Sequence, residues 1–173
     1  MNNIFFRNLE DNKDSYQKIY FWCQKDFVYQ WFEQRKLTFE EIENKYKTKL
    51  EKRIQDIYFI NINHKDIGLI QIYPFNNDIN ISLEGIIYEF DLFIGEEDYL
   101  NKGYGKKIIH NIVDKIMKEK KADYIILRPF SDNERAINCY RKCGFYPRAS
   151  YLDKDTLGNS KETILMVYTK CQK

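Results

Sequence analysis

Residues 88–107, YEFDLFIGEEDYLNKGYGKK, contain the strongest structural signal in this 173-residue chain. The first seven of them are mostly apolar or aromatic, which is typical of a strand buried on both faces. Gly95 and the acidic residues after it end this strand. Beyond the glycines, apolar residues recur at the spacing of one helix face, at Ile108, Ile109, Ile112, Val113 and Ile116. The pattern therefore predicts a strand, a glycine-rich turn and a helix, in that order.

The turn at residues 100–105, LNKGYG, has the chemistry of a phosphate-binding loop. The first N–H groups of a helix have no intrahelical partner and lie at the positive end of its dipole. Gly103 and Gly105 have no Cβ, so a phosphate can approach those donors closely, and Lys102 and Lys106 add positive charge. A G-x-G turn at a helix start is weak evidence by itself, because many such turns only fold the chain.

A second motif stands further along, NERAINCYRKCGF at residues 133–145. The two motifs together resemble the GCN5-related N-acetyltransferase (GNAT) family, which binds acetyl-CoA with a (Gln/Arg)-x-x-Gly-x-(Gly/Ala) loop and carries an N-x-x-A-x-x-x-Y helix downstream. Within this family, FDLFIGE at residues 90–96, followed by an aromatic residue, Lys102 and G-x-G, is most similar to the aminoglycoside 6′-N-acetyltransferases. The resemblance spans nearly the whole chain.

This resemblance implies a mixed α/β fold of the GNAT type. Its central mixed sheet is flanked by helices, and acetyl-CoA lies in a cleft between two splayed parallel strands. The oxyanion would be met by a backbone N–H near Leu92 or Phe93. The resemblance also assigns residues that would contact the cofactor, namely Phe93, Ile94, Lys102, Gly103, Tyr104, Gly105, Lys106, Asn133 and Ala136.

The resemblance further implies direct attack by the acceptor amine, without an acyl-enzyme. Tyr140 would protonate the leaving thiolate, although an amphipathic helix could also carry it as a core residue. Asp91 would bind the acceptor ammonium or take its proton, and a carboxylate in so apolar a strand needs a partner or a cavity. The expected acceptor contacts are Trp31, Gln71, Tyr73, Glu89 and Asp91. An aromatic residue at helical spacing, such as Trp31, is more often part of a core.

Two positions depart from the family pattern. Leu100 stands where the loop usually begins with Gln or Arg, but backbone donors carry most of that interaction, so binding is expected to survive. Arg128 precedes Pro129 where the aminoglycoside subgroup tends to place Asp. A cation there would repel a polycationic antibiotic if it faced the pocket, or it could pair with a nearby acid or the cofactor.

Length and charge limit the other possibilities. The chain is expected to be a single acetyltransferase domain over residues 1–173, because three prolines and seven glycines leave no linker. The net charge of +2 and the dispersed lysines argue against nucleic-acid binding. Residues 66–101 hold eight carboxylates and no basic residue, which suggests a site for a cationic amine, although each single acid is more simply a solvated surface residue.

The cysteines and the first residues of the chain bear on metal binding and on cellular location. The four cysteines lack the spacing of zinc ligands, so no metal is expected, and reduced thiols favour the cytoplasm. The first residues do not resemble a signal peptide, and no apolar stretch approaches the ~20 residues of a membrane span. Whether the protein is a monomer or a homodimer is left open.

The remaining pattern predicts the order of the elements. Strands are expected at 4–9, 57–63, 67–73, 88–94, 123–127, 145–151 and 162–169. Helices are expected around 16–23 and 27–32, after a capping box at Thr38–Glu41, after the glycine loop, and after a second capping box at Ser131–Glu134. A hairpin turn is expected at 64–66, and Gly144 is expected just past the end of the last helix.

The leading hypothesis is an acetyl-CoA-dependent transferase acting on the 6′-amine of aminoglycosides, and hence conferring antibiotic resistance. A second hypothesis keeps the reaction and changes the acceptor to a polyamine, an amino-sugar metabolite or a protein amine. A third is a catalytically silent acetyl-CoA-binding module, against which the presence of both Asp91 and Tyr140 argues.

Overall fold

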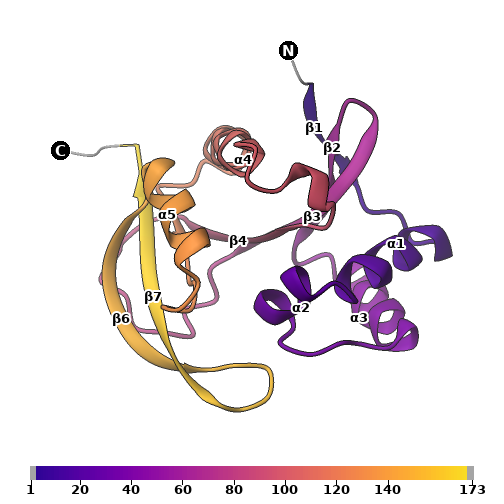
Figure 1. Cartoon of the computed structure of the whole chain (residues 1–173). Helices are drawn as coiled ribbons and strands as arrows, with labels where there is room; N and C mark the ends of the chain where they lie inside the picture. Colours follow the sequence, from indigo (N-terminus) through magenta and orange to yellow (C-terminus); the bar gives the residue numbers. More distant parts are fainter. Residues whose placement is uncertain (1–2, 171–173) are drawn as a thin grey trace. The chain divides into compact units, whose positions relative to one another are not determined.

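The computed structural model describes residues 3–170, which form seven strands, five α-helices and one 3₁₀ turn (Figure 1). The strands are β1 (Ile4–Asn8), β2 (Asp56–Ile62), β3 (Lys65–Pro74), β4 (Ile87–Ile94), β5 (Tyr124–Leu127), β6 (Tyr146–Lys154) and β7 (Ser160–Thr169). The helices are α1 (Lys13–Cys23), α2 (Asp26–Phe32), α3 (Phe39–Lys52), α4 (Tyr104–Glu119) and α5 (Glu134–Lys142), with the 3₁₀ turn η1 at Glu97–Tyr99.

The strands form one sheet in the order β1-β2-β3-β4-β5-β7-β6. Strands β4 and β5 run parallel, as the intervening helix α4 requires, whereas β1–β2, β2–β3, β5–β7 and β6–β7 are antiparallel. The expectation of a mixed α/β fold with a central mixed sheet is thus confirmed. The chain divides into two compact units, residues 3–72 with 91–102 and residues 73–90 with 103–170.

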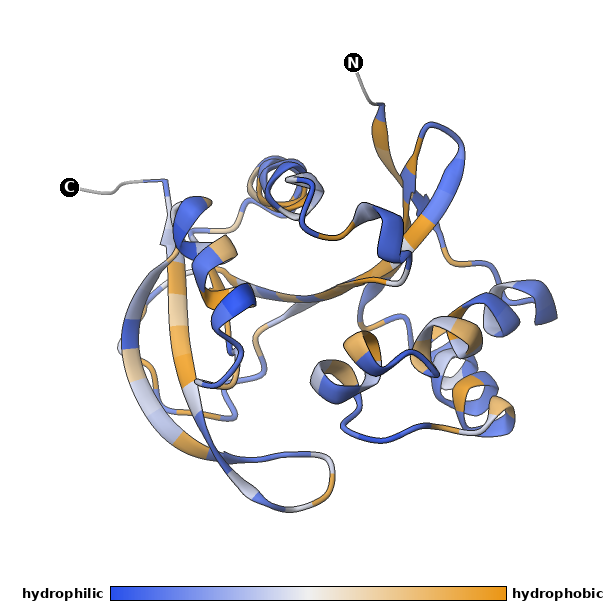
Figure 2. Ribbon diagram, viewed as in Figure 1, coloured by the Kyte–Doolittle hydropathy of each residue, from blue (hydrophilic) through white to orange (hydrophobic). Residues whose placement is uncertain are grey.

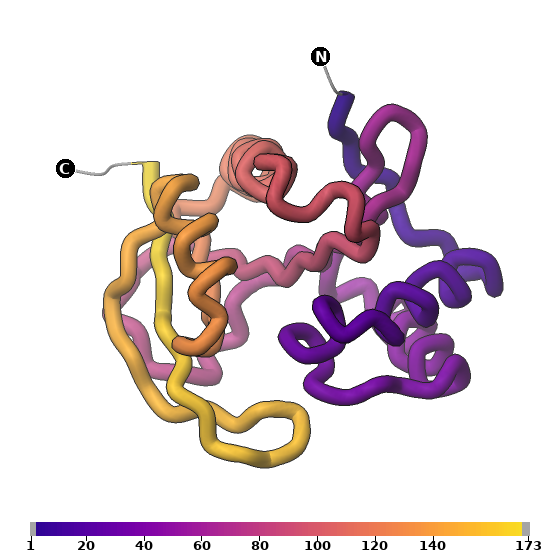
Figure 3. The backbone as a smooth tube through the Cα atoms, viewed as in Figure 1, coloured from indigo at the N-terminus to yellow at the C-terminus, as the bar shows by residue number. Residues whose placement is uncertain are grey.

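The first unit contains the β2–β3 hairpin, whose turn is visible in the smooth trace of the backbone (Figure 3). Asn63 and His64 both have positive φ, at 50° and 68°, the combination that two-residue hairpin turns need. Because β3 already begins at Lys65, the turn is shorter than the predicted 64–66.

Helices α1, α2 and α3 share one hydrophobic core with strands β2 and β3 of this unit. Trp22 contacts the rings of Phe59 and Phe93 edge to face, and Phe93 also meets Phe32 at 4.8 Å between ring centroids. The capping box that begins α3 is confirmed in both directions, since Thr38 Oγ1 accepts from Glu41 N–H and the Glu41 carboxylate accepts from Thr38 N–H.

The second unit is built on β5, β7 and β6. Residues 160–169 and 146–154 form a long hairpin closed by the loop 155–159, and β6 at the sheet edge is mostly exposed. The apolar residues of β7 gather in its second half, toward the C-terminus (Figure 2). Part of the segment 75–86 packs against this core through Phe75, Ile79, Ile81 and Leu83.

The predicted start of α5 is wrong by two residues. Asn133, not Ser131, is the N-cap, and its side-chain oxygen accepts from Ala136 N–H at 3.2 Å. The backbone N–H of Ser131 instead donates to Glu162 of β7, so tertiary pairing keeps that residue outside the helix. The end of α5 is as predicted, with Gly144 following the C-cap at φ 92°.

Between residues 3 and 170 there is no helix long and apolar enough to cross a membrane.

Candidate functional site

The glycine loop forms the start of helix α4. Gly103 is the N-cap, in the left-handed conformation with φ 79°, and it has no side chain with which to cap the helix. No side chain therefore caps the first N–H groups of α4. Lys102 and Lys106 are exposed at this end of the helix, and the partly exposed Tyr104 is its first residue. The predicted phosphate cradle has the local geometry that an anion needs.

The two glycines of the loop differ in what surrounds them. A Cβ added to Gly103 would meet nothing within 4 Å, so the space beside it is open. A Cβ added to Gly105 would lie 3.5 Å from the sulfur of Cys139 on α5. Gly103 thus provides the left-handed turn and an open face, while Gly105 sits where α4 approaches α5.

Helix α5 carries three of the predicted residues. Asn133 and Ala136 are joined by the N-cap hydrogen bond, so the Ala136 N–H is engaged within the helix start. Tyr140 is partly exposed and its ring lies 6.0 Å from that of Phe145. Its assignment as the proton donor stays a prediction.

Asp91 lies in the second half of β4 and is exposed, whereas Phe90 and Phe93 on either side are buried. The Phe93 side chain belongs to the core of the first unit, and any contact with a cofactor would come from its backbone. The partly buried Ile94 ends the strand. The predicted acid is thus accessible on an otherwise largely covered strand.

Gln71, predicted to contact the acceptor, is only 2% exposed on β3. Its Oε1 accepts hydrogen bonds from Lys49 Nζ and from Gln55 Nε2, the latter at 3.3 Å. Burial lowers the pKa of Lys49 to about 8, and the charge of Lys45 acts in the same direction, against the opposing effects of Asp91 and Glu33. Sequence reasoning missed Lys49, because on α3 it follows the pattern of a solvated lysine.

A second basic residue of α3, Lys45, pairs with a buried acid. Glu33, 6% exposed just after α2, forms an ion pair with Lys45, whose ammonium lies 5.9 Å from the Phe32 ring. Trp31 precedes Phe32 on α2 and is partly exposed, so it is not enclosed in the core. Of the remaining predicted acceptor contacts, Tyr73 is partly exposed near the end of β3.

Arg128, just after β5, makes a bidentate ion pair with Glu89 of β4. Its Nε and Nη2 atoms donate to the two carboxylate oxygens of Glu89 at 2.7 and 2.9 Å, and Nη1 donates to Asp78 at 2.8 Å. Burial lowers the pKa of Arg128, but these acids outweigh it and raise the pKa further, so the cation is firmly held. The structure therefore gives Glu89, expected to be a contact for the substrate cation, an internal cation as its partner.

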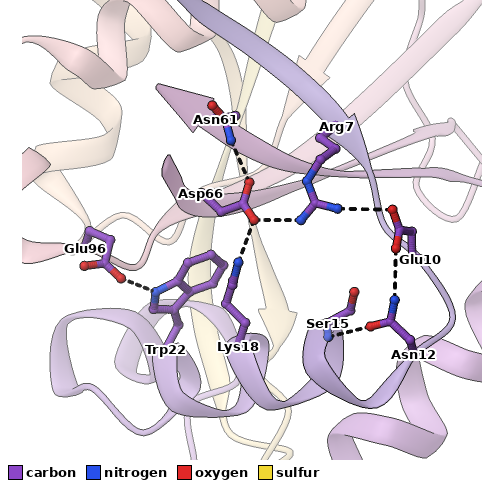
Figure 4. A network of polar contacts seen from close by, with 9 residues as sticks. All are labelled: Arg7, Glu10, Asn12, Ser15, Lys18, Trp22, Asn61, Asp66 and Glu96. Atoms are coloured by element: carbon purple, nitrogen blue, oxygen red, sulfur yellow. Dashed lines mark hydrogen bonds and ion pairs between the residues drawn. The ribbon is translucent and has the colours of Figure 1, made fainter. Parts of the chain in front are cut away.

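The acidic stretch is compensated by bases from distant parts of the chain. Asp66 accepts from both Arg7 and Lys18 at 2.6 Å, and Glu96 accepts from Trp22 (Figure 4). Glu96 also accepts from Lys65. Together with Asp78 and Glu89, four of the eight carboxylates in 66–101 thus have basic partners. A view of the stretch as one uncompensated acidic surface is not supported.

No group of three or more His, Cys, Asp or Glu side chains that could hold a metal ion occurs among residues 3–170.

Comparison with known proteins gives a consistent result. The domain family described as acetyltransferase (GNAT) domain matches residues 11–151. The aminoglycoside N(6′)-acetyltransferases type 1 of Klebsiella pneumoniae and Serratia marcescens are each 24% identical over 138 residues, covering 73% of this chain and 67% of theirs.

Solved structures share the fold. Aminoglycoside acetyltransferase AAC(6′)-Ib with coenzyme A and kanamycin superposes with a TM-score of 0.79 at 20% identity, covering 97% of this chain and 95% of that one. Spermidine N-acetyltransferase from Vibrio cholerae, in complex with CoA and spermine, gives 0.77 at 18% identity, covering 96% and 95%. An uncharacterised Bacillus halodurans protein gives 0.87 at 20% identity, covering 98% and 85%.

Proposed function

Because the chain belongs to the GNAT family of acetyltransferases, we propose that it transfers the acetyl group of acetyl-CoA to the 6′-amine of aminoglycosides. The observation that carries the proposal is the exposed carboxylate of Asp91 on a largely buried strand of a chain with aminoglycoside-acetylating relatives. An exposed carboxylate attracts a protonated amine and can accept its proton, directly or through water. Resistance to such antibiotics would follow from this activity.

The start of α4 supports the choice of acetyl-CoA as donor. Its uncapped N–H groups, the open side of Gly103 and the exposed Lys102 and Lys106 suit the pyrophosphate of a coenzyme A molecule. The backbone of Phe93 and Ile94 would hold the pantetheine arm, and Asn133 and Ala136 would line it from α5. When bound, the thioester supplies an activated acetyl group.

The other predicted site residues would transfer protons, stabilise the oxyanion or position the acceptor amine. Asp91 would hold the acceptor amine and help it lose its proton, so that a neutral nitrogen attacks the thioester carbonyl. A backbone N–H near Leu92 or Phe93 would stabilise the oxyanion. Tyr140 would give its proton to the departing thiolate, and Trp31, Gln71 and Tyr73 would orient the acceptor.

One observation favours a different amine acceptor. Arg128 already neutralises Glu89 and shares Asp78, so two acids that could bind further ammonium groups are occupied by the chain's own guanidinium. An aminoglycoside carries several ammonium groups and would lose those contacts. A smaller amine, such as a polyamine or an amino-sugar metabolite, needs fewer of them.

A thiol-release assay with acetyl-CoA tests the proposal, with kanamycin, tobramycin and spermidine as parallel acceptors. Release with both antibiotics, falling about 10²- to 10⁴-fold in kcat/KM in Asp91→Asn, would support the aminoglycoside reaction and the role of Asp91. Release only with spermidine, or with none of the three, would rule out the antibiotic as the acceptor. Binding of acetyl-CoA without any release would favour a silent module.

The double variant Glu89→Gln with Arg128→Gln tests whether this ion pair favours a smaller amine over an aminoglycoside as acceptor. Changing both members avoids leaving a buried charge without its partner. If the pair limits the acceptor, the double variant changes the ratio of kcat/KM for tobramycin and spermidine. An unchanged ratio would assign the pair to stability alone.

A further inference from the structure

Cys139 and Cys143 form a thiol pair at the contact between α5 and α4. They are four residues apart, Cys139 within α5 and Cys143 at its C-cap, and both are free thiols. The buried Cys143 lies against the first turn of α4, where its sulfur is 3.8 Å from the carbonyl oxygen of Lys106. The thiol pair therefore adjoins the loop described above as a phosphate cradle.

Cys139 is the accessible member of the pair. It is partly exposed, and its sulfur lies 3.5 Å from the position that a Cβ would take at Gly105. Three basic residues stand close to it in the fold. Arg135 and Lys142 lie one helical turn before and after it on α5, and Lys106 follows Gly105 on α4. An electropositive and partly exposed surrounding is the kind in which cysteines react.

Hydrogen bonding and charge favour the thiolate of Cys139. A hydrogen bond from Cys143 lowers the pKa of Cys139 to about 7 against the opposing effect of burial, and the charges of Lys142, Arg135 and Lys106 add to the lowering. The same interaction, together with burial, raises the pKa of Cys143 well above the ordinary range. Near pH 7, about half of Cys139 is thus ionised, while Cys143 stays protonated.

The chain contains a matched contrast to this cysteine. Cys23 is fully buried in the core of the first unit, and burial raises its pKa to about 12. It combines low access with a protonated sulfur, and both properties suppress reaction. Cys171 lies outside the described residues.

We propose that Cys139 is a thiol-modification site that reacts with small anionic disulfides of the glutathione type. The thiolate of Cys139 attacks one sulfur of the disulfide, a new S–S bond forms to Cys139, and the old S–S bond breaks. The second half leaves as a thiolate and takes a proton from water. The carboxylates of such a disulfide suit the cations of Lys106, Arg135 and Lys142.

The mixed disulfide is the expected end product. Its further conversion would need Cys143 as the attacking thiolate, and Cys143 is buried and protonated. The adduct beside Gly105 would crowd the start of α4. This consequence rests on the proposed function of that loop, because it matters only if acetyl-CoA binds there.

The test exposes the folded full-length chain to oxidised glutathione, with Cys171 replaced by Ser to remove the fourth thiol. Intact mass and peptide mapping locate the adduct over a pH series. We expect one adduct, at Cys139, with a rate that is half-maximal near pH 7 and is reversed by a reducing agent. Equal labelling of Cys23, or no labelling of Cys139 above that of Cys143, would overturn the proposal.

Two variants separate reactivity from simple exposure. Cys143→Ala removes the hydrogen-bond donor and is expected to move the midpoint upward and slow the reaction severalfold at pH 7. Cys143→Ser keeps a donor and is expected to preserve a midpoint close to that of the parent. Identical pH profiles in all three proteins would contradict the role of the thiol pair.

Binding of acetyl-CoA tests the part of the inference that rests on the proposed function. Acetyl-CoA has no free thiol that could exchange with the disulfide. Calorimetry first measures its binding to the unmodified chain, and a failure there counts against the proposed function rather than against the labelling. Where it binds, we expect it to slow adduct formation at Cys139 and the adduct to weaken its binding. Binding with no mutual effect would show that the adduct leaves the loop open.

Discussion

Gly103 is the residue at which backbone conformation and ligand access coincide. Its φ of 79° is one that a side chain disfavours, while the space beside it is open. We expect Gly103→Ala to lower the free energy of unfolding by about 1 kcal/mol, because alanine is strained in the left-handed region. We also expect severalfold weaker coenzyme A binding by calorimetry, since the new Cβ projects into the open side of the loop.

Gly158 provides the control for this change. It has φ 84° and equally open surroundings, but it lies in the loop between β6 and β7. Gly158→Ala should cost a similar free energy of unfolding and leave coenzyme A affinity unchanged. Equal loss of affinity in the two variants would show that the loss comes from general destabilisation.

Single residues also show where sequence reasoning reaches its limit. Gly103, Asp91 and Tyr140 could be singled out because each belongs to a local motif, and their roles stay predictions. The partners of Arg128 and Lys49 were not, since Glu89 and Gln71 come from other strands and their contacts depend on pairing across the fold. A local pattern of lysines on a helix gives no sign of which one becomes buried.

At the scale of an element, the start of α5 is decided by tertiary pairing. Both Ser131 and Asn133 fit the local signal for an N-cap, but Ser131 N–H is engaged by β7. We expect Asn133→Ala to reduce the free energy of unfolding by about 1 kcal/mol, as the loss of an N-cap does. Ser131→Ala should change the free energy of unfolding by less than half as much in the same denaturant titration. A larger loss in Ser131→Ala than in Asn133→Ala would instead support Ser131 as the N-cap, as the sequence predicted.

The Asp66 cluster joins four elements of the first unit, β1, α1, β2 and β3 (Figure 4). Burial raises the pKa of Asp66, but hydrogen bonds from Arg7, Lys18 and Asn61 outweigh it and hold the pKa at about 2. We expect Asp66→Asn to lower the free energy of unfolding at pH 7 by about 1–3 kcal/mol, because it leaves two cations without their acid.

The pH dependence of this effect has a definite sign. A carboxyl whose folded pKa lies below its unfolded value of 3.8 stabilises the fold above about pH 4 and loses that contribution as pH falls toward 2. The difference between wild type and Asp66→Asn should therefore shrink at pH 2.5. Glu10→Gln is the control, since Glu10 is 64% exposed in its pair with Arg7 and should matter by less than about 0.5 kcal/mol.

Across the whole molecule, the order and kinds of elements followed from periodicity, while the distribution of charge did not. The carboxylates of residues 66–101 looked uncompensated along the chain, yet Arg7, Lys18, Lys65 and Arg128 are brought to them by folding. Strand and helix periods are local properties of a sequence. Ion pairing between distant segments is a property of the topology and cannot be read from spacing.

The partly buried Lys49 should affect the stability of the whole molecule. The pKa of Lys49 falls from 10.5 to about 8 on folding, chiefly through burial, so the unfolded chain binds its proton more tightly than the folded one. The free energy of unfolding should then rise with pH between about 8 and 10. At about 1.4 kcal/mol per pKa unit, the cost of charged Lys49 at neutral pH is at most about 3.5 kcal/mol.

Lys49→Met removes the buried charge while keeping an unbranched side chain. We expect the variant to exceed wild type in free energy of unfolding at pH 7 by about 1–2 kcal/mol, less than the upper bound because the hydrogen bond to Gln71 is also lost. The advantage should narrow by pH 9.5, where wild-type Lys49 is largely neutral. Comparing the two proteins at each pH cancels the titration of buried thiols and phenols, and an advantage constant from pH 7 to 9.5 would show that Lys49 keeps an ordinary pKa in the fold.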